Sequence, residues 1–213
     1  MLGKFSVQIA RAIDRYDIAH EFSIKHKRVL KSYGVDGISS AKARWKYLPN
    51  VYMIAVYDNI SGEMIGGMRL EVSSQKYLLP FEAALGNTMP EVKKFVSTHR
   101  YSGGVCEFSG LWVDPKFRKM HIPEYMTKLG ITLSGKLGIK YAFAFANNYS
   151  RPITEKLGFD VQSIDGQTVF LYPDERYPTQ LMRKDCTTGL SDALVESEEF
   201  LKEHALDHIV PAR

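Results

Sequence analysis

Two mostly apolar runs, at 105–113 and 141–146, flank a segment at about 122–137 whose apolar residues recur at helical spacing. Each run has the length of a strand, and a helical crossover of this size joins strands that lie parallel in one sheet. A short helical segment and Leu157-Gly158-Phe159 follow the second run. The stretch from 105 to 159 therefore predicts a βαβα unit, and with it an α/β fold.

The remaining elements follow from periodicity and turn residues. The pattern predicts strands at 4–10, 51–57 and 63–72, helices at 14–34 and 91–98, and a final hairpin at 159–172 that turns at Asp165-Gly166. Pro173 and Pro178 are expected to end regular structure. The whole pattern predicts a mixed, strongly twisted sheet of about six or seven strands with helices on both faces.

The length of 213 residues allows one large domain with an appendage. We expect the domain at 1–180 and a C-terminal extension at 181–213 that carries an acidic helix at 190–206. That helix would pack on its own domain or on another subunit, so a homodimer is one arrangement that the sequence suggests.

The formal net charge is +4, which suits an acidic partner or a phosphorylated cofactor but is too small and scattered to indicate nucleic acid. The apolar runs are shorter than the ~20 residues of a membrane span, and we expect none. No secretory signal is visible, and two cysteines do not suggest a disulfide scaffold, so we expect a cytoplasmic protein.

The clearest local signal is the junction after the first apolar run, where Asp114-Pro115 leads through Arg118 and Lys119 into a helix. The first turn of a helix offers unpaired N–H groups and the positive end of the dipole, which together attract phosphate. A plain surface turn remains the alternative on this signal alone.

The order of elements and the motif Leu111-Trp112-Val113-Asp114-Pro115-x-x-Arg118 resemble the GNAT superfamily of N-acyltransferases. The resemblance implies acyl-CoA or another acyl-pantetheine as cosubstrate and no prosthetic group. It also implies donor contacts from the strand and from the phosphate loop and second motif that follow it: Leu111, Trp112, Val113, Arg118, Lys119, His121, Ile122 and Asn147.

The chain departs from that family at three positions. His121 and Pro123 stand where the phosphate loop has glycines, and Thr154 stands where the family has a tyrosine acid. Pro123 has no N–H, so the loop has one phosphate donor fewer. The pantetheine arm of an acyl carrier protein carries one phosphodiester and would need less from this loop, so a carrier protein is a candidate partner.

A narrower resemblance is to the acyl-homoserine-lactone synthases and related N-acyl amino acid synthases. Glu107-Phe108-Ser109 is similar to their Glu-x-Ser-Arg signature, and Met68-Arg69-Leu70 followed by Leu79-Pro80 is similar to a second region. Gly110 occupies the arginine position of the signature, which weakens the case for a homoserine-type acceptor.

An amine that attacks a thioester must lose a proton, and a nearby carboxylate can take it. Glu107 is the candidate base, with Arg69 as the residue that would position it or an acceptor carboxylate. The alternative is a structural ion pair between these two residues. His99, His121 and Cys106 lack the spacing of a metal site, so no metal is expected, and Cys106 is interpreted as a small buried residue.

The sequence therefore predicts an N-acyltransferase that moves an acyl group from acyl-CoA or acyl carrier protein to a small-molecule amine by direct attack. The alternative from a different class is a catalytically silent GNAT-like module that binds a ligand or partner. Free thiol release in the presence of an amine separates the two.

Overall fold

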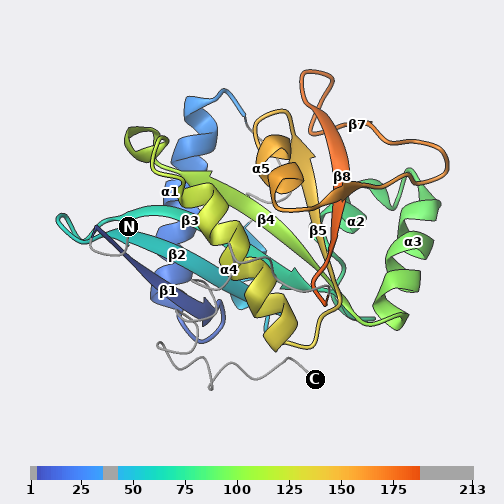
Figure 1. Ribbon diagram of the computed structural model, residues 1–213, viewed down its shortest axis with the longest axis horizontal. Coiled ribbons are helices and arrows are strands. Elements are labelled where there is room, and N and C mark those ends of the chain that lie inside the picture. Colours follow the sequence, from blue (N-terminus) through green and yellow to red (C-terminus); the bar gives the residue numbers. More distant parts are fainter. Residues whose placement is uncertain (1–3, 36–42, 188–213) are drawn as a thin grey trace.

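The computed structural model describes residues 4–35 and 43–187, which form one eight-stranded sheet with helices on both faces (Figure 1). The strand order is β1-β2-β3-β4-β5-β8-β6, and β7 also pairs with β8. The pair β4–β5 is parallel, and the other pairs are antiparallel. The predicted mixed sheet is confirmed, with eight strands in place of six or seven.

The strands are β1 (Phe5–Arg11), β2 (Val51–Asp58), β3 (Met64–Val72), β4 (Val105–Val113), β5 (Tyr141–Asn147), β6 (Asp160–Val161), β7 (Phe170–Leu171) and β8 (Pro178–Asp185). The α-helices are α1 (Tyr16–Ser32), α2 (Pro80–Leu85), α3 (Pro90–Tyr101), α4 (Ile122–Lys136) and α5 (Arg151–Lys156). Two 3₁₀ helices, η2 (Ala43–Tyr47) and η3 (Pro115–Phe117), complete the described elements. None of the described helices is long and apolar enough to cross a membrane.

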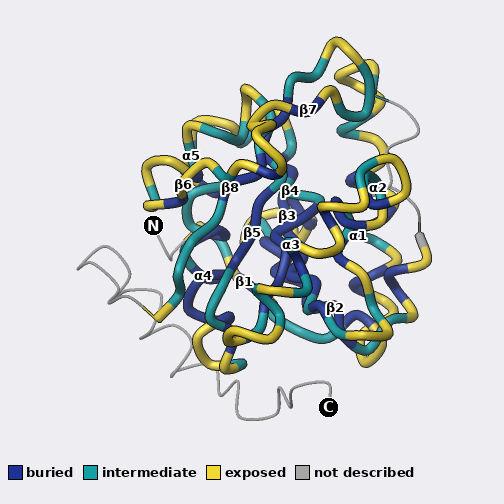
Figure 2. The backbone as a smooth tube through the Cα atoms, turned by 90° about the vertical axis from the view of Figure 1, so that its right-hand side faces the viewer, coloured by how far each residue is buried: buried dark blue, intermediate teal, exposed yellow. Residues whose placement is uncertain are grey.

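The two faces of the sheet have separate apolar cores because neighbouring strand residues point to opposite sides. On β2, Met53 packs with α1 and Trp45 of η2, whereas Ile54 packs with α4. Helices α2 and α3 cover the β4–β5–β8 part of the α1 face, and α4 covers the opposite face. The central strands are the most deeply buried part of the chain (Figure 2).

The predicted βαβα unit is confirmed as β4, α4, β5 and α5, and the predicted hairpin at 51–72 as β2 and β3. The end of regular structure at Pro178 was wrong, because Pro178 begins β8. A proline is tolerated as the first residue of a strand, where its missing N–H does little harm. The expected hairpin at 159–172 is only an isolated bridge around Asp165-Gly166; β6 and β7 each pair with β8 instead.

The boundary predicted at residue 180 falls inside β8, which pairs with β5 from Thr179 to Asp185. The sheet therefore includes this segment. The acidic helix expected at 190–206 lies outside the described residues.

Gly67→Ala should lower the free energy of unfolding by about 1–3 kcal/mol, because it overpacks the contact between β3 and α1. A Cβ at residue 67 would lie 2.7 Å from Cδ2 of Phe22 and 2.9 Å from Nε1 of Trp112. Gly135→Ala in α4 is the matched control, since the nearest atom to its Cβ would be 3.9 Å away. Urea unfolding should show that control unchanged or up to ~1 kcal/mol more stable; equal effects at both sites would contradict the packing.

Candidate functional site

Four polar side chains lie buried side by side on the α1 face of the sheet. The strand register pairs Arg69 with Ser109 and Glu71 with Glu107, so all four point to this face. Nη2 of Arg69 lies 3.1 Å from Oε1 of Glu71 and donates a hydrogen bond of 3.1 Å to Oγ of Ser109. The Ser109 hydroxyl donates to Oε1 of Glu71 at 2.6 Å. The Arg69 guanidinium also lies 4.5 Å from the Trp45 ring centroid, so its geometry is fixed by its surroundings.

Glu107 is 3% exposed, and its Oε2 accepts a hydrogen bond of 2.9 Å from the backbone N–H of Phe81. That donor belongs to the first turn of α2, where an N–H has no partner within the helix. Burial raises the pKa of Glu107 well above the usual value of a carboxyl group, and the N–H of Phe81 opposes this rise. The side chain is therefore a carboxyl group that keeps its proton to a higher pH than an exposed glutamate does.

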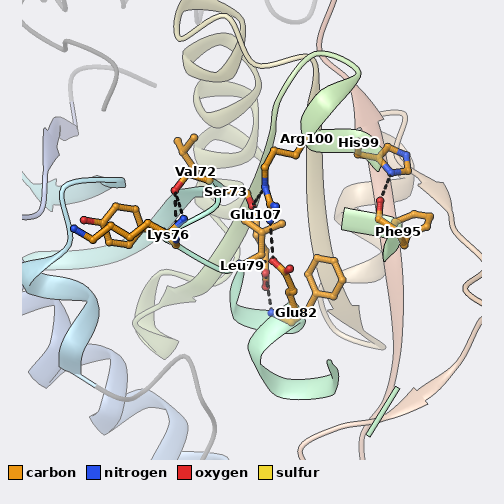
Figure 3. A network of polar contacts seen from close by, with 12 residues as sticks. Val72, Ser73, Lys76, Leu79, Glu82, Phe95, His99, Arg100 and Glu107 are labelled. Atoms are coloured by element: carbon orange, nitrogen blue, oxygen red, sulfur yellow. Dashed lines mark hydrogen bonds and ion pairs between the residues drawn. The ribbon is translucent and has the colours of Figure 1, made fainter. Parts of the chain in front are cut away.

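A second, partly buried ion pair fixes the segment that supplies this N–H. Arg100 of α3 lies 3.4 Å from Oε2 of Glu82 and donates two hydrogen bonds to Oγ of Ser73 (Figure 3). Glu82 in turn accepts from the N–H of Leu79. The start of α2 is thus held against the sheet, which positions the Phe81 N–H at Glu107.

Strands β4 and β5 separate beyond Phe108, the residue after Glu107. Their parallel pairing runs from Val105↔Tyr141 to Phe108↔Ala144, after which the two strands diverge (Figure 1). Beside this point β4 contains a bulge: between Ser109 and Trp112 it has one residue more than β3 has opposite, and Gly110 adopts φ +58°. Part of the β4 backbone is therefore left facing the gap between the strands.

A cavity of about 460 Å³ occupies this gap and reaches both faces of the sheet. Glu107 and Phe81 border it on the α1 face, and Thr127 and Ile153 on the α4 face. Its other borders include residues from α1, from β4, from the segments after β4 and β5, and from β8 and the segment before it: His26, Leu30, Tyr33, Ser109, Gly110, Leu111, Trp112, Val113, Arg118, Asn147, Tyr149, Tyr172, Tyr177 and Thr179.

The charges around the cavity are few. Among the described residues that line it, the carboxyl group of Glu107 and the guanidinium of Arg118 are the charge-bearing groups, apart from His26. Burial and the nearby charge of Arg69 lower the pKa of His26 to about 3, so its imidazole is neutral at physiological pH. The cavity therefore has an acidic group at the sheet and a cation on the loop before α4.

The loop before α4 contains a left-handed backbone turn of the kind that glycine usually provides, but a histidine occupies it. His121 adopts φ 54° and ψ 18°, the left-handed conformation that glycine favours. Pro123 lies in the first turn of α4, where it removes one of the unpaired N–H groups. Glu124 follows, and Lys156 holds its carboxylate with two contacts of 3.1 Å. Arg118 lies with its guanidinium carbon 4.9 Å from the ring centroid of Tyr33.

The predicted site residues fall into two groups. Those that line the cavity are Glu107, Leu111, Trp112, Val113, Arg118 and Asn147. Those that the cavity lining does not include are Arg69, Lys119, His121 and Ile122: Arg69 is buried in the ion pair with Glu71, Ile122 is buried in the core, and Lys119 and His121 are exposed. The Oδ1 of Asn147 accepts from the N–H of Tyr149, so this side chain shapes the turn after β5.

Sequence reasoning missed the contribution of α1. His26, Val29, Leu30 and Tyr33 line the cavity at spacing i, i+3, i+4 and i+7, which is one face of a helix. The sequence predicted the helix but no site residue on it. The helical spacing of these residues was visible in the sequence, but it does not show that this face borders a cavity.

Thr154 also lines the cavity, at the position where the family resemblance has a tyrosine. Its hydroxyl donates a hydrogen bond of 2.8 Å to the carbonyl oxygen of Arg151 within α5. Cys106 is buried beside Ser134, as expected of a small core residue. In the described ranges, no group of three or more histidine, cysteine, aspartate or glutamate side chains is placed to hold a metal.

The arrangement of the elements is shared with solved acyltransferases. FeeM, an N-acyl amino acid synthase from uncultured soil microbes, aligns over 87% of this chain and 92% of its own with 14% identity and a TM-score of 0.64. The CoA-dependent acyl-homoserine lactone synthase BjaI aligns over 98% and 91% with 16% identity and a TM-score of 0.58. A mosquito arylalkylamine N-acetyltransferase aligns over 85% and 99% with 18% identity and a TM-score of 0.57.

The chain has the GNAT fold. At these identities the likeness is one of fold, and it confirms the expected GNAT-like architecture. No protein-family model matches the sequence, and no curated protein matches it significantly.

Proposed function

We propose that this protein is an N-acyltransferase that moves an acyl group from a pantetheine thioester to an amine by direct attack. The observation that carries the proposal is the position of Glu107. This buried carboxyl group borders a cavity that opens where β4 and β5 separate, and the same cavity reaches Arg118 on the loop before α4. An acid–base group, a gap for a thioester and a cation for a phosphate thus share one continuous space.

The reaction requires one proton transfer before the attack and one after it. Glu107 takes a proton from the ammonium form of the acceptor, and the freed lone pair attacks the thioester carbonyl carbon. Backbone N–H groups of β4 near the bulge at Gly110 stabilise the oxyanion that forms. The C–S bond then breaks, the second amine proton goes to the departing thiolate, and Glu107 returns its proton to solvent.

The donor would lie along the gap between β4 and β5, with its phosphate toward Arg118. The phosphate loop keeps the left-handed turn at His121 but has lost the N–H at Pro123 and carries Glu124 beside it. This loop is suited to few phosphate charges. Acyl-CoA and acyl carrier protein are both donors of this chemical class, and the carrier protein presents a single phosphodiester.

Release of free thiol is the direct test. Acyl-CoA or acyl carrier protein, with short and long acyl groups, should release thiol when a panel of primary amines is added, and mass spectrometry should find the matching amide. If the protein is instead a catalytically silent binding module, it should bind a ligand without turnover. The absence of thiol release with both donors across the panel would sink the enzymatic proposal.

Arg118→Ala should raise KM for acyl-CoA about 10-fold or more, because it removes a charge-assisted contact to phosphate. An S-acyl pantetheine without any phosphate is the matched substrate control, and its KM should stay within about twofold of that of the unaltered protein. Steady-state kinetics with both donors gives the comparison. If both KM values rise together, Arg118 acts on the shape of the site and not on phosphate.

A further inference from the structure

Resting on the proposed acyl transfer, we infer that the acceptor is a primary amine with an apolar body and no carboxylate beside its nitrogen. At Glu107 the cavity offers an acid to the amine, and the cation whose charge acts on Glu107, Arg69, is already paired with Glu71. This assigns a substrate class, an alkyl or arylalkyl amine, and excludes α-amino acids.

The charged groups on the α1 face leave Glu107 as the carboxyl group without an arginine of its own. Three carboxyl groups, those of Glu71, Glu82 and Glu107, are buried there with the guanidinium of Arg69, and the partly buried guanidinium of Arg100 lies beside them. Arg69 lies 3.1 Å from Glu71, and Arg100 lies 3.4 Å from Glu82. Each guanidinium thus has a carboxylate of its own, and Glu107, the third acid, is the one that borders the cavity.

The cavity lining contains few groups that could pair with a carboxylate of the acceptor. Arg118 is the cationic side chain among its described residues, and it lies on the loop before α4 against the ring of Tyr33. The imidazole of His26 is neutral, as described above. The charge of Arg69 also acts on Glu107, but Arg69 is already paired with Glu71. A carboxylate bound next to the amine at Glu107 would therefore be buried beside two carboxyl groups that share one guanidinium, which is strongly unfavourable.

The net charge of the bound complex differs between an amine and an α-amino acid. An amine bound at Glu107 gives a neutral complex, whether the shared proton resides on nitrogen or on the carboxyl oxygen. An α-amino acid at the same place adds one negative charge to that complex. A Cβ at residue 110 would lie 3.2 Å from both Nε and Nη2 of Arg69, so this part of the wall has no room for a further cationic side chain.

The apolar body follows from the rest of the cavity lining. Val29 and Leu30 of α1 border the cavity, as do Phe81, whose N–H donates to Glu107, and Tyr172 and Tyr177 before β8. Aliphatic and aromatic surfaces of this kind favour an alkyl or aromatic group attached to the amine.

Binding calorimetry with matched acceptors tests the inference. Tyramine, tyrosine amide and tyrosine share one ring, and only tyrosine adds a carboxylate. Titrated into the full chain with and without coenzyme A, tyramine and tyrosine amide should bind at least about 10-fold more tightly than tyrosine. Phenethylamine should likewise bind at least about 10-fold more tightly than phenylalanine. Glu107→Gln should raise the dissociation constant of tyramine at least about 10-fold. It should also reduce the ratio between the dissociation constants of tyrosine and tyramine.

Two results overturn the inference: tyrosine binding as tightly as tyramine, or no binding of any of these amines. Because binding is measured without an acyl donor, it is separable from turnover. Tight amine binding with no thiol release would contradict the acyl transfer and leave the amine preference standing. Thiol release that is fastest with tyrosine would support the acyl transfer and contradict the amine preference.

Discussion

Glu107→Gln should lower kcat for amine acylation at least about 100-fold, because glutamine cannot accept the proton that the attacking amine loses. The substitution keeps the size of the side chain, and its amide oxygen can still accept the hydrogen bond from the Phe81 N–H. KM for the acyl donor should change little, since the donor contacts lie along β4 and the loop before α4. Initial rates of thiol release at saturating acceptor give the comparison.

The pH dependence should identify the same group. Glu107 must be ionised to act as a base, and burial raises its pKa well above the usual value. Activity, as kcat/KM, should therefore increase with pH through a value higher than ~4.3, the ordinary glutamate pKa. Glu107→Gln should lack this limb, whereas Glu91→Gln, an exposed glutamate of α3, should leave rate and profile unchanged. A residual rate in Glu107→Gln within tenfold of the unaltered protein would assign the base elsewhere.

Arg69→Met should lower the free energy of unfolding by about 3–5 kcal/mol at pH 7, because it leaves the Glu71 carboxylate buried without its guanidinium. The methionine fills much of the arginine volume, so the loss reports mainly the unpaired charge. Urea unfolding followed by circular dichroism measures it.

The double variant Arg69→Met/Glu71→Gln is the matched control. It removes both charges, and it should recover most of the lost stability. A deficit below about 1 kcal/mol at pH 7 would show that the pair contributes little.

The βαβα unit was predictable because each of its elements has a strong local pattern. Strand β4 and helix α4 show their periodicity within a few residues, and the parallel pairing follows from the length of the crossover. Arg118 could be proposed from the same local pattern, since it lies after a strand and before a helix, and it borders the cavity. Its contact with a phosphate stays a prediction.

The parts that were not predictable depend on contacts between distant segments. The pairing of Arg69 with Glu71 joins residues two apart on one strand, and the network closes only through Ser109 on the next strand. The N–H that reaches Glu107 comes from α2, 26 residues earlier in the chain. Strand β8 was hidden because it starts at a proline and ends in Arg183-Lys184-Asp185, so its apolar alternation is short.

The insertion of β8 between β5 and β6 also sets an order of assembly during synthesis. β5 forms one wall of the cavity, and its other side pairs with β8 over seven residues, from Tyr141↔Asp185 to Asn147↔Thr179. A nascent chain that has not yet delivered residues 178–185 leaves this side of β5 as an open edge, which invites pairing with other chains. The cavity can therefore reach its final shape only late in synthesis, and a chain shortened before residue 178 should aggregate instead of retaining a weakened site.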